Sequence, residues 1–214
     1  MINCEFSEIC LNMLYKQKTI QCLNVMHWNA QGITNSTLIY QLEHVLNQKQ
    51  IDVVFINESF LNPSHKFKIS NYKIYRQDRI THGGGVLIAI KNTIPHQHIT
   101  MIPTTNVENI SIIIYINNRA VRFTSAYCPR NNSSFIDDLN KITTTTSEFF
   151  VFGDLNAHHV SWNCYDNNTA GRKLYNHQLN SNYYIYSPNS FTRFGQRTTS
   201  TQPSVVDLLL TNSS

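Results

Sequence analysis

Several polar side chains stand where an apolar, strand-like run of this 214-residue sequence ends. A single carboxylate after a strand is commonplace, and most such residues are turn or cap residues. Asn, Glu, Tyr and Asp at several strand ends in one chain are harder to explain by turns alone. If the ends meet at one edge of a sheet scaffold, their side chains could form a single site. The candidates are Asn29, Glu58, Tyr127, Asp154, Asn156 and, within the last apolar run, Asp207.

The chemistry that these residue types support together is hydrolysis of a phosphodiester. Carboxylates are hard oxygen ligands that suit Mg²⁺, which keeps several waters and uses one or two protein carboxylates beside phosphate oxygens. Mn²⁺ is a possible substitute. Asn amides can orient a phosphate or a water without adding negative charge. An Asp can align or deprotonate the attacking water, and a Tyr hydroxyl can donate to developing charge.

The elements that must position these residues are mostly strands. Asn35 or Ser36 could cap a helix whose apolar residues from Leu38 to Leu46 recur at helical spacing. The segment 117–119, Asn-Asn-Arg, is typical of a hairpin turn because Asn tolerates positive φ. A second helix is predicted over 172–179. Strands are predicted over 20–28, 51–56, 72–75, 86–90, 110–116, 120–126, 149–152 and 205–210.

Many strands on short connections, with too few helices for strict alternation, indicate an α+β fold. A two-layer β-sandwich with helices outside fits this pattern best. We find no internal repeat or linker, so the sequence predicts one domain at 20–214 that follows an N-terminal extension at 1–19.

Composition narrows the class of protein only slightly. No apolar run approaches the roughly 18 residues of a membrane span, and the charged residues within 1–20 argue against a signal peptide. The five cysteines form no CxxC pair, which favours a reducing, intracellular compartment. A net charge of +4 and a pI near 8.8 favour a polyanionic partner only weakly, since the basic residues are scattered.

Three other interpretations of the sequence are weaker. Gly83 to Gly85 lacks the Lys-Ser/Thr of a phosphate loop and fits a tight entry into a strand better. The adjacent pair His158-His159 does not have the spacing of zinc ligands. No serine lies in a Gly-x-Ser-x-Gly elbow, which removes the common hydrolase alternative.

Whole motifs, in order along the chain, resemble those of the endonuclease/exonuclease/phosphatase family. The strongest is Gly153-Asp154-Leu155-Asn156-Ala157-His158-His159 with Trp162 three residues on, whose form is similar to endonuclease domains of LINE-type (non-LTR) retrotransposons. The others are Trp28-Asn29-Ala30-Gln31-Gly32, Ile56-Asn57-Glu58-Ser59-Phe60-Leu61, Tyr75-Arg76-Gln77-Asp78-Arg79 with Gly83-Gly84-Gly85-Val86, Ala126-Tyr127-Cys128-Pro129 and Val205-Val206-Asp207-Leu208.

The resemblance implies a DNase I-like, four-layer α/β sandwich, with two packed β-sheets flanked by helices, that cleaves phosphodiester bonds with Mg²⁺. Carried over by motif, Glu58 would hold the metal with Asn29 nearby. Asp154 would position or activate the attacking water, and Asn156 would hold the scissile phosphate. Tyr127 would stabilise the phosphate in the transition state.

The resemblance also implies DNA as the substrate, and a nick whose 3′ hydroxyl primes reverse transcription. Arg76 and Arg79, within a matched motif, are predicted DNA contacts. Arg193 is a third, because Phe191-Thr192-Arg193-Phe194 resembles a loop that approaches DNA in the family. A reverse transcriptase domain would be a partner within the parent polyprotein. Action on genomic DNA implies a nuclear location.

The sequence departs from the family pattern at its end. The resemblance gives Asp207 the role of orienting a catalytic histidine in a Ser-Asp-His motif that lies further on, and this chain stops at Ser214 without that motif. We therefore expect a C-terminally truncated domain with impaired nicking. One alternative is a catalytically dead transposon remnant that folds or binds DNA without cleaving it. Another is a different chemistry of the family, such as abasic-site cleavage or phosphatase action.

Overall fold

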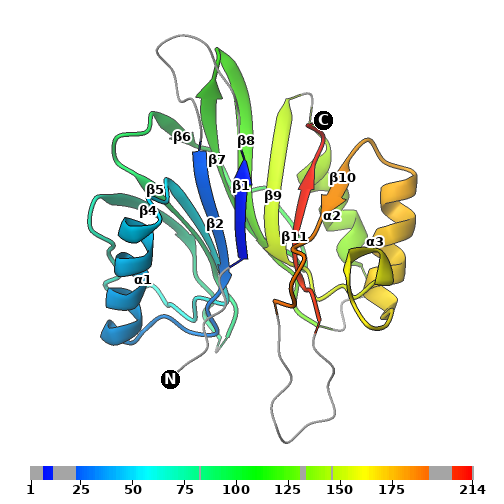
Figure 1. Ribbon diagram of the computed structural model, residues 1–214, viewed down its shortest axis with the longest axis horizontal. Coiled ribbons are helices and arrows are strands. Elements are labelled where there is room, and N and C mark those ends of the chain that lie inside the picture. Colours follow the sequence, from blue (N-terminus) through cyan, green and yellow to red (C-terminus); the bar gives the residue numbers. More distant parts are fainter. Residues whose placement is uncertain are drawn as a thin grey trace, which may run out of the picture.

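The computed structural model describes residues 7–11, 23–81, 83–130, 134–145, 147–192 and 204–213. Within these residues two β-sheets pack face to face, and helices cover the outer face of each sheet (Figure 1). Helix α1 lies outside the first sheet, and helices α2 and α3 lie outside the second. The predicted α+β class and the four-layer sandwich are confirmed.

The first sheet has the strand order β1-β2-β3-β5-β4. Its central strands β2 and β3 run parallel, and the other neighbours are antiparallel. The parallel pair carries two candidate residues to the same end of the sheet. The strands are β1 (Ser7–Leu11), β2 (Leu23–Asn29), β3 (Val53–Asn57), β4 (Tyr72–Gln77) and β5 (Val86–Lys91).

The second sheet has the strand order β10-β11-β9-β8-β7-β6, in which β8 and β9 form its parallel pair. Strands β7 and β8 form a hairpin whose turn residues Asn117 and Asn118 have φ of 49° and 60°. The predicted turn is therefore confirmed. The strands are β6 (His96–His98), β7 (Glu108–Ile116), β8 (Arg119–Tyr127), β9 (Glu148–Asp154), β10 (Tyr184–Tyr186) and β11 (Asp207–Thr211).

The three α-helices have Asn or Ser at the N-cap, as helix chemistry favours, and two of these side chains make the cap hydrogen bond. Asn35 accepts a hydrogen bond from the Thr37 amide at 2.8 Å, and Asn168 accepts one from the Gly171 amide at 2.7 Å. The described helices are α1 (Ser36–Gln48), α2 (Phe135–Thr143), the 3₁₀ turn η1 (Val160–Trp162) and α3 (Thr169–Leu179). No described helix has the length and hydropathy that a membrane crossing requires.

Three apolar layers hold the sandwich together. The central layer lies between the sheets and contains a row of stacked rings, in which the Phe55 and Phe152 centroids are 4.4 Å apart and those of Phe123 and Phe150 are 5.2 Å apart. The outer layers pack α1 on the first sheet and the other helices on the second. Burial of these side chains dominates folding and fixes how the two sheets face each other.

The structure corrects several element predictions. Helix α2 and the strands β1, β6 and β10 were not predicted, and β1 lies within the segment 1–19 that was expected to be an extension. The second predicted helix begins at Thr169 rather than Arg172. The last strand begins at Asp207, whereas Val205 and Val206 precede it as an extended, buried segment. The strand predicted to start at Ile20 is described from Leu23 onward.

Candidate active site

The carboxyl ends of the two parallel strand pairs meet across the sandwich. In the first sheet, Asn29 at the end of β2 is in register with Asn57 at the end of β3, and Glu58 follows directly. In the second sheet, Tyr127 ends β8 in register with Asp154 at the end of β9. The chain thus brings four predicted residues from distant segments to one junction between the sheets.

Asn29 joins the two sheets through its side-chain amide. Its Nδ2 donates to Glu58 Oε1 at 3.0 Å and to Asp154 Oδ2 at 2.6 Å. Each hydrogen of the amide nitrogen therefore points to a carboxylate of a different sheet. Its Oδ1 accepts only a 3.3 Å bond from the Gln31 amide within the described chain. Within the described part of the chain, no ion pair to a Lys or Arg accompanies either carboxylate.

Asp154 has the most perturbed environment of the predicted carboxylates. Burial and, after it, the nearby Asp207 carboxylate raise the pKa of Asp154 to about 7. Hydrogen bonds from the Asn156 amide, at 2.9 Å to Oδ1, and from Asn29 oppose this rise. A carboxylate with a pKa near neutrality can take a proton from water at physiological pH.

Asn57 is a positioning residue that the sequence reasoning did not single out. It is wholly buried, and its Oδ1 accepts from the Asp154 backbone amide at 2.8 Å and from His27 Nε2 at 2.7 Å. Its Nδ2 donates to Ser125 Oγ at 3.0 Å. A first-sheet side chain thus fixes the backbone of the second sheet at Asp154. A polar residue at the end of the apolar run of β3 was the available clue.

His27 and Asp207 form a buried pair beneath this junction. Because the Asn57 carbonyl oxygen can only accept, His27 Nε2 must carry a hydrogen, and Nδ1 faces Asp207 Oδ1 at 3.3 Å. Burial lowers the pKa of His27 and raises the pKa of Asp207 to about 6. Both shifts disfavour the charged form of the buried group.

The Tyr127 hydroxyl is held in its protonated form. Burial raises the pKa of Tyr127, and the Glu58 and Asp154 carboxylates and a hydrogen bond to Glu58 raise it further. The phenol therefore remains a donor across the physiological pH range. This matches the role that the resemblance implies for it, donation toward a negatively charged group.

Asn156 lies beside these residues with a positive φ of 46°. Its Nδ2 donates to the Cys128 carbonyl at 2.9 Å, and its Oδ1 accepts from Arg130 Nε at 3.3 Å. Its backbone carbonyl accepts from Asn168 Nδ2 at 2.9 Å, which ties this loop to the start of α3. Arg130 is exposed and lies next to the site.

The predicted DNA contacts lie at the same end of the sandwich, but with partners inside the protein. Arg79 pairs with Glu108, to which its Nε donates at 2.6 Å, and Glu108 also accepts from the Gly85 amide at 2.5 Å. Arg76 lies 3.3 Å from Asp78 and donates to the His65 carbonyl at 3.0 Å. Arg193 lies outside the described residues, so all three contacts remain predictions.

The residues at the junction suit a hard divalent cation. Glu58 contributes to the raised pKa of both Asp154 and Asp207, so added positive charge would relieve the repulsion among three acids. Among the described residues, no three His, Cys, Asp or Glu side chains are grouped closely enough to form a complete ligand set. The Glu58 carboxylate and the Asn29 Oδ1 provide oxygen atoms of the kind that Mg²⁺ binds.

Comparison with known proteins agrees with this geometry. The family described as endonuclease-reverse transcriptase matches residues 121–214. The chain is 28% identical over 176 residues to a probable RNA-directed DNA polymerase from transposon X-element of Drosophila melanogaster. It is 26% identical over 159 residues to the corresponding protein from transposon BS of the same species. The match covers 80% and 71% of this chain but only 19% and 17% of those relatives.

Solved structures show the same fold. The endonuclease domain of TRAS1, a telomere-specific non-LTR retrotransposon, superposes with a TM-score of 0.69 at 14% identity, over 87% of this chain and 83% of that one. An AP endonuclease from Archaeoglobus fulgidus gives a TM-score of 0.64 at 14% identity, over 89% and 86%.

The fold is that of these endonuclease structures, and the family match over residues 121–214 agrees with the resemblance to endonuclease/exonuclease/phosphatase proteins. Within that class, the resemblance to non-LTR retrotransposon proteins, first indicated by the motifs, is confirmed.

Proposed function

We propose that this chain is a divalent-metal-dependent phosphodiesterase that nicks DNA. The observation that carries the proposal is the double hydrogen bond of Asn29, which joins Glu58 of one sheet to Asp154 of the other. Asp154 is buried and Glu58 is half-buried, and no ion pair joins either carboxylate to a Lys or Arg of the described residues. Two carboxylates this close repel each other, and a structural role alone does not explain their placement. A cation and a phosphate ester at this point would satisfy the whole set.

The chain's own residues would divide the reaction between them. Asp154, with its pKa near 7, would accept a proton from the water that attacks phosphorus. The bond from phosphorus to the 3′ oxygen would break at the same time, and that oxygen would take a proton from solvent to become the 3′ hydroxyl. Tyr127 would donate a hydrogen bond to a non-bridging phosphate oxygen as charge develops there. The Asn156 amide, held between Cys128 and Arg130, would orient the scissile phosphate. Asn29 keeps Asp154 and Glu58 in fixed relative positions.

Mg²⁺, or Mn²⁺ in its place, would bind through Glu58 with the Asn29 Oδ1 nearby. Bound there, the ion would supply positive charge that stabilises the developing negative charge of the phosphate. Asn29 Oδ1 suits this role because the Gln31 amide is its one partner in the described chain, at 3.3 Å. The proposal is testable through binding as well as through activity.

We infer DNA as the substrate from the relatives, which are retrotransposon proteins, and from the net charge of +4. In a transposon setting the nick would lie in genomic DNA, so the proposed location is the nucleus. The proposed partner is a reverse transcriptase domain, since the curated relatives are described as probable RNA-directed DNA polymerases.

The test is nicking of a supercoiled plasmid under single-turnover conditions, with the protein in excess, in Mg²⁺ and in EDTA. We expect nicking in Mg²⁺ only. Glu58→Gln and Asp154→Asn should each lower the rate at least about 100-fold, as loss of a group that acts in the transition state does. Asp137→Asn, an exposed acid at the start of α2, is the matched control and should cleave like the native chain.

The same assay separates the alternatives. An oligonucleotide with one abasic site and a small phosphomonoester are offered in parallel with the plasmid. Faster turnover of either would replace DNA nicking with abasic-site cleavage or phosphatase action. A folded chain that binds DNA but cleaves none of the three substrates would be a remnant without catalysis. Unchanged nicking by Asp154→Asn would refute the assignment of the site.

A further inference from the structure

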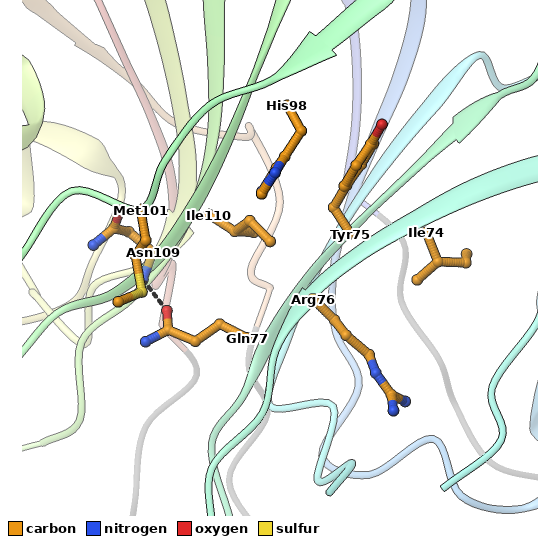
Figure 2. A pocket seen from close by; sticks show the side chains of 8 residues that line it. All are labelled: Ile74, Tyr75, Arg76, Gln77, His98, Met101, Asn109 and Ile110. Carbon is orange, nitrogen blue, oxygen red and sulfur yellow. Dashed lines mark hydrogen bonds between the residues drawn. The ribbon is translucent and has the colours of Figure 1, made fainter. Parts of the chain in front are cut away.

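A pocket of about 390 Å³ opens beside the candidate site, where edge strand β4 of the first sheet faces β6 and β7 of the second. Figure 2 shows Tyr75 and His98 on one side of it, Gln77, Asn109 and Met101 on the other, and Ile110 between them. A pocket of this size can hold a small organic ring system. The proposed chemistry does not use it.

One wall of the pocket is aromatic and carries positive charge nearby. The Tyr75 and His98 rings are stacked, with centroids 4.6 Å apart and planes 5° from parallel. The Lys73 ammonium lies 5.4 Å from the Tyr75 ring centroid. None of the eight lining residues is acidic. Such a wall favours a flat π-system attached to an anion.

The opposite wall presents a hydrogen-bond donor and an acceptor. Gln77 Oε1 accepts from the Asn109 backbone amide at 3.0 Å, which leaves the Gln77 Nε2 hydrogens available among the described residues. The Asn109 Nδ2 donates to the Ile102 carbonyl and to Thr104 Oγ1, both at 2.9 Å. Its buried Oδ1 has no partner in the described chain. Met101, flexible and 45% exposed, lies beside these groups and could move aside for a ligand.

The pocket lies at the catalytic end of the sandwich. Gln77 is in register with Val86, and Val86 with Asn57, so two strand spacings, about 10 Å, separate Gln77 from Asn57. Nucleotides of one DNA strand rise about 3.4 Å each along the duplex axis. A base in the pocket would therefore belong to a nucleotide about three positions from the scissile phosphate.

We propose that this pocket, bounded by Tyr75, Gln77, His98, Met101 and Asn109, binds one nucleobase of the DNA substrate close to the nick. The base would stack on the aromatic wall and present adjacent donor and acceptor atoms to Gln77 and Asn109, as unstacked bases do in protein pockets. Lys73 would face the attached phosphate. The inference rests on the proposed action on DNA, and it adds a site that reads the DNA next to the cut.

The test has two arms on the full chain. In the first, deoxynucleoside monophosphates and ribose 5-phosphate are titrated separately while amide resonances are followed by NMR. We expect shifts at Tyr75, Gln77 and Ile110 with the nucleotides and none with the sugar phosphate. In the second, binding of duplexes with a single abasic site moved along the strand is measured in Ca²⁺. One position within about three nucleotides of the nick should weaken binding about tenfold.

Met101→Trp, which fills the pocket, should abolish both the NMR shifts and the tenfold effect of the abasic site on DNA binding. Tyr115→Trp, an exposed aromatic at the far end of the same strand β7, is the control and should change neither. The proposed pocket would be refuted if nucleotides caused no NMR shifts. It would also be refuted if the abasic site still weakened DNA binding to Met101→Trp. Nucleotide shifts without any DNA binding would instead point to a free nucleotide as ligand and would count against the proposed nuclease function.

Discussion

Replacing Asn57 by Leu should separate the positioning of Asp154 from the binding of DNA. The side chain is wholly buried and lies at the end of β3, so it does not touch solvent. Leu has a similar shape but accepts no hydrogen bond. The substitution therefore removes the acceptor of the Asp154 amide and of His27 Nε2 while it leaves the phosphate-facing side chains unaltered.

The magnitude follows from the groups left without partners. A buried donor that loses its acceptor costs about 1–3 kcal/mol, and two donors are affected, so we expect a stability loss of about 2–6 kcal/mol. The Asp154 backbone would shift toward another acceptor. A displacement of about 1 Å at a catalytic group can lower the rate about 100-fold. We expect that loss in the rate constant of nicking and little change in DNA affinity.

The assay combines single-turnover nicking, DNA binding in Ca²⁺ and chemical denaturation. Ser125→Ala is the matched control, because it removes only the partner of the Asn57 Nδ2 and leaves both bonds to Oδ1 in place. It should lower stability but keep most of the rate. In the Asp154→Asn background, Asn57→Leu should lower the residual rate no further, since its effect acts through Asp154.

Two results would refute this reasoning. The first is additive losses in the double variant of Asn57 and Asp154, which would mean that Asn57 acts elsewhere. The second is an equal loss of rate in Ser125→Ala and Asn57→Leu at matched stability. That outcome would make the network a structural support without specific control of Asp154.

Three further expectations concern charge, metal and packing. Burial raises the pKa of Asp207 to about 6, so the proton on this carboxyl stabilises the fold fully below about pH 4, and this contribution is lost as the pH rises through 6. In chemical denaturation, the unfolding free energy of Asp207→Asn should exceed that of the native chain by about 3 kcal/mol at pH 8 and equal it at pH 4. Mg²⁺ at tenfold its Kd should raise the unfolding free energy of the native chain by about 1.4 kcal/mol, but not that of Glu58→Gln. A Cβ on Gly153 would lie 2.2 Å from the Ala126 carbonyl oxygen, so Gly153→Ala should cost about 1–3 kcal/mol in denaturation and separate β8 from β9 next to the site.

The sequence predicted the strands that lie in the middle of the sheets. Runs such as Val53 to Ile56 are apolar throughout because both faces of the strand are covered, and the helix at Ser36 shows its period and its cap. The short edge strands escaped prediction because their three residues carry no period of their own. Strand β6 is defined only by its pairing with β7.

Helix α2 was missed for a different reason. Its apolar residues Phe135, Leu139 and Ile142 do recur at helical spacing, but polar residues and the β-branched run from Thr143 onward surround them. Asp138, on the same helix, accepts from the backbone amides of Asn106 and Val107 at 2.6 and 3.1 Å. Those amides lower the pKa of Asp138 although its burial opposes this. Such a tertiary contact has no signature in the local sequence.

The candidate site itself could be predicted only in part. Motifs identified the residues that would face a substrate, because their side chains follow strand ends. His27 and Ser125 lie inside strands, and Asn57 is the buried last residue of β3; such polar residues have meaning only once the facing sheet is known. The pairing of His27 with Asp207 joins segments 180 residues apart, and no pattern of spacing specifies it. The approach of the two sheets creates the network.

Residues that face the substrate and residues that hold them in place should change the unfolding free energy in opposite directions when they are replaced. A network that served only the fold would lose stability whenever a member is removed, because each buried partner would be left unpaired. At this junction the acids repel one another, and burial raises the pKa of both Asp154 and Asp207. Removing a charge should therefore stabilise the chain while it lowers nicking, whereas removing the neutral support Asn57 should lower both. Opposite signs for the two classes of substitution are what a junction shaped by chemistry, rather than by packing, requires.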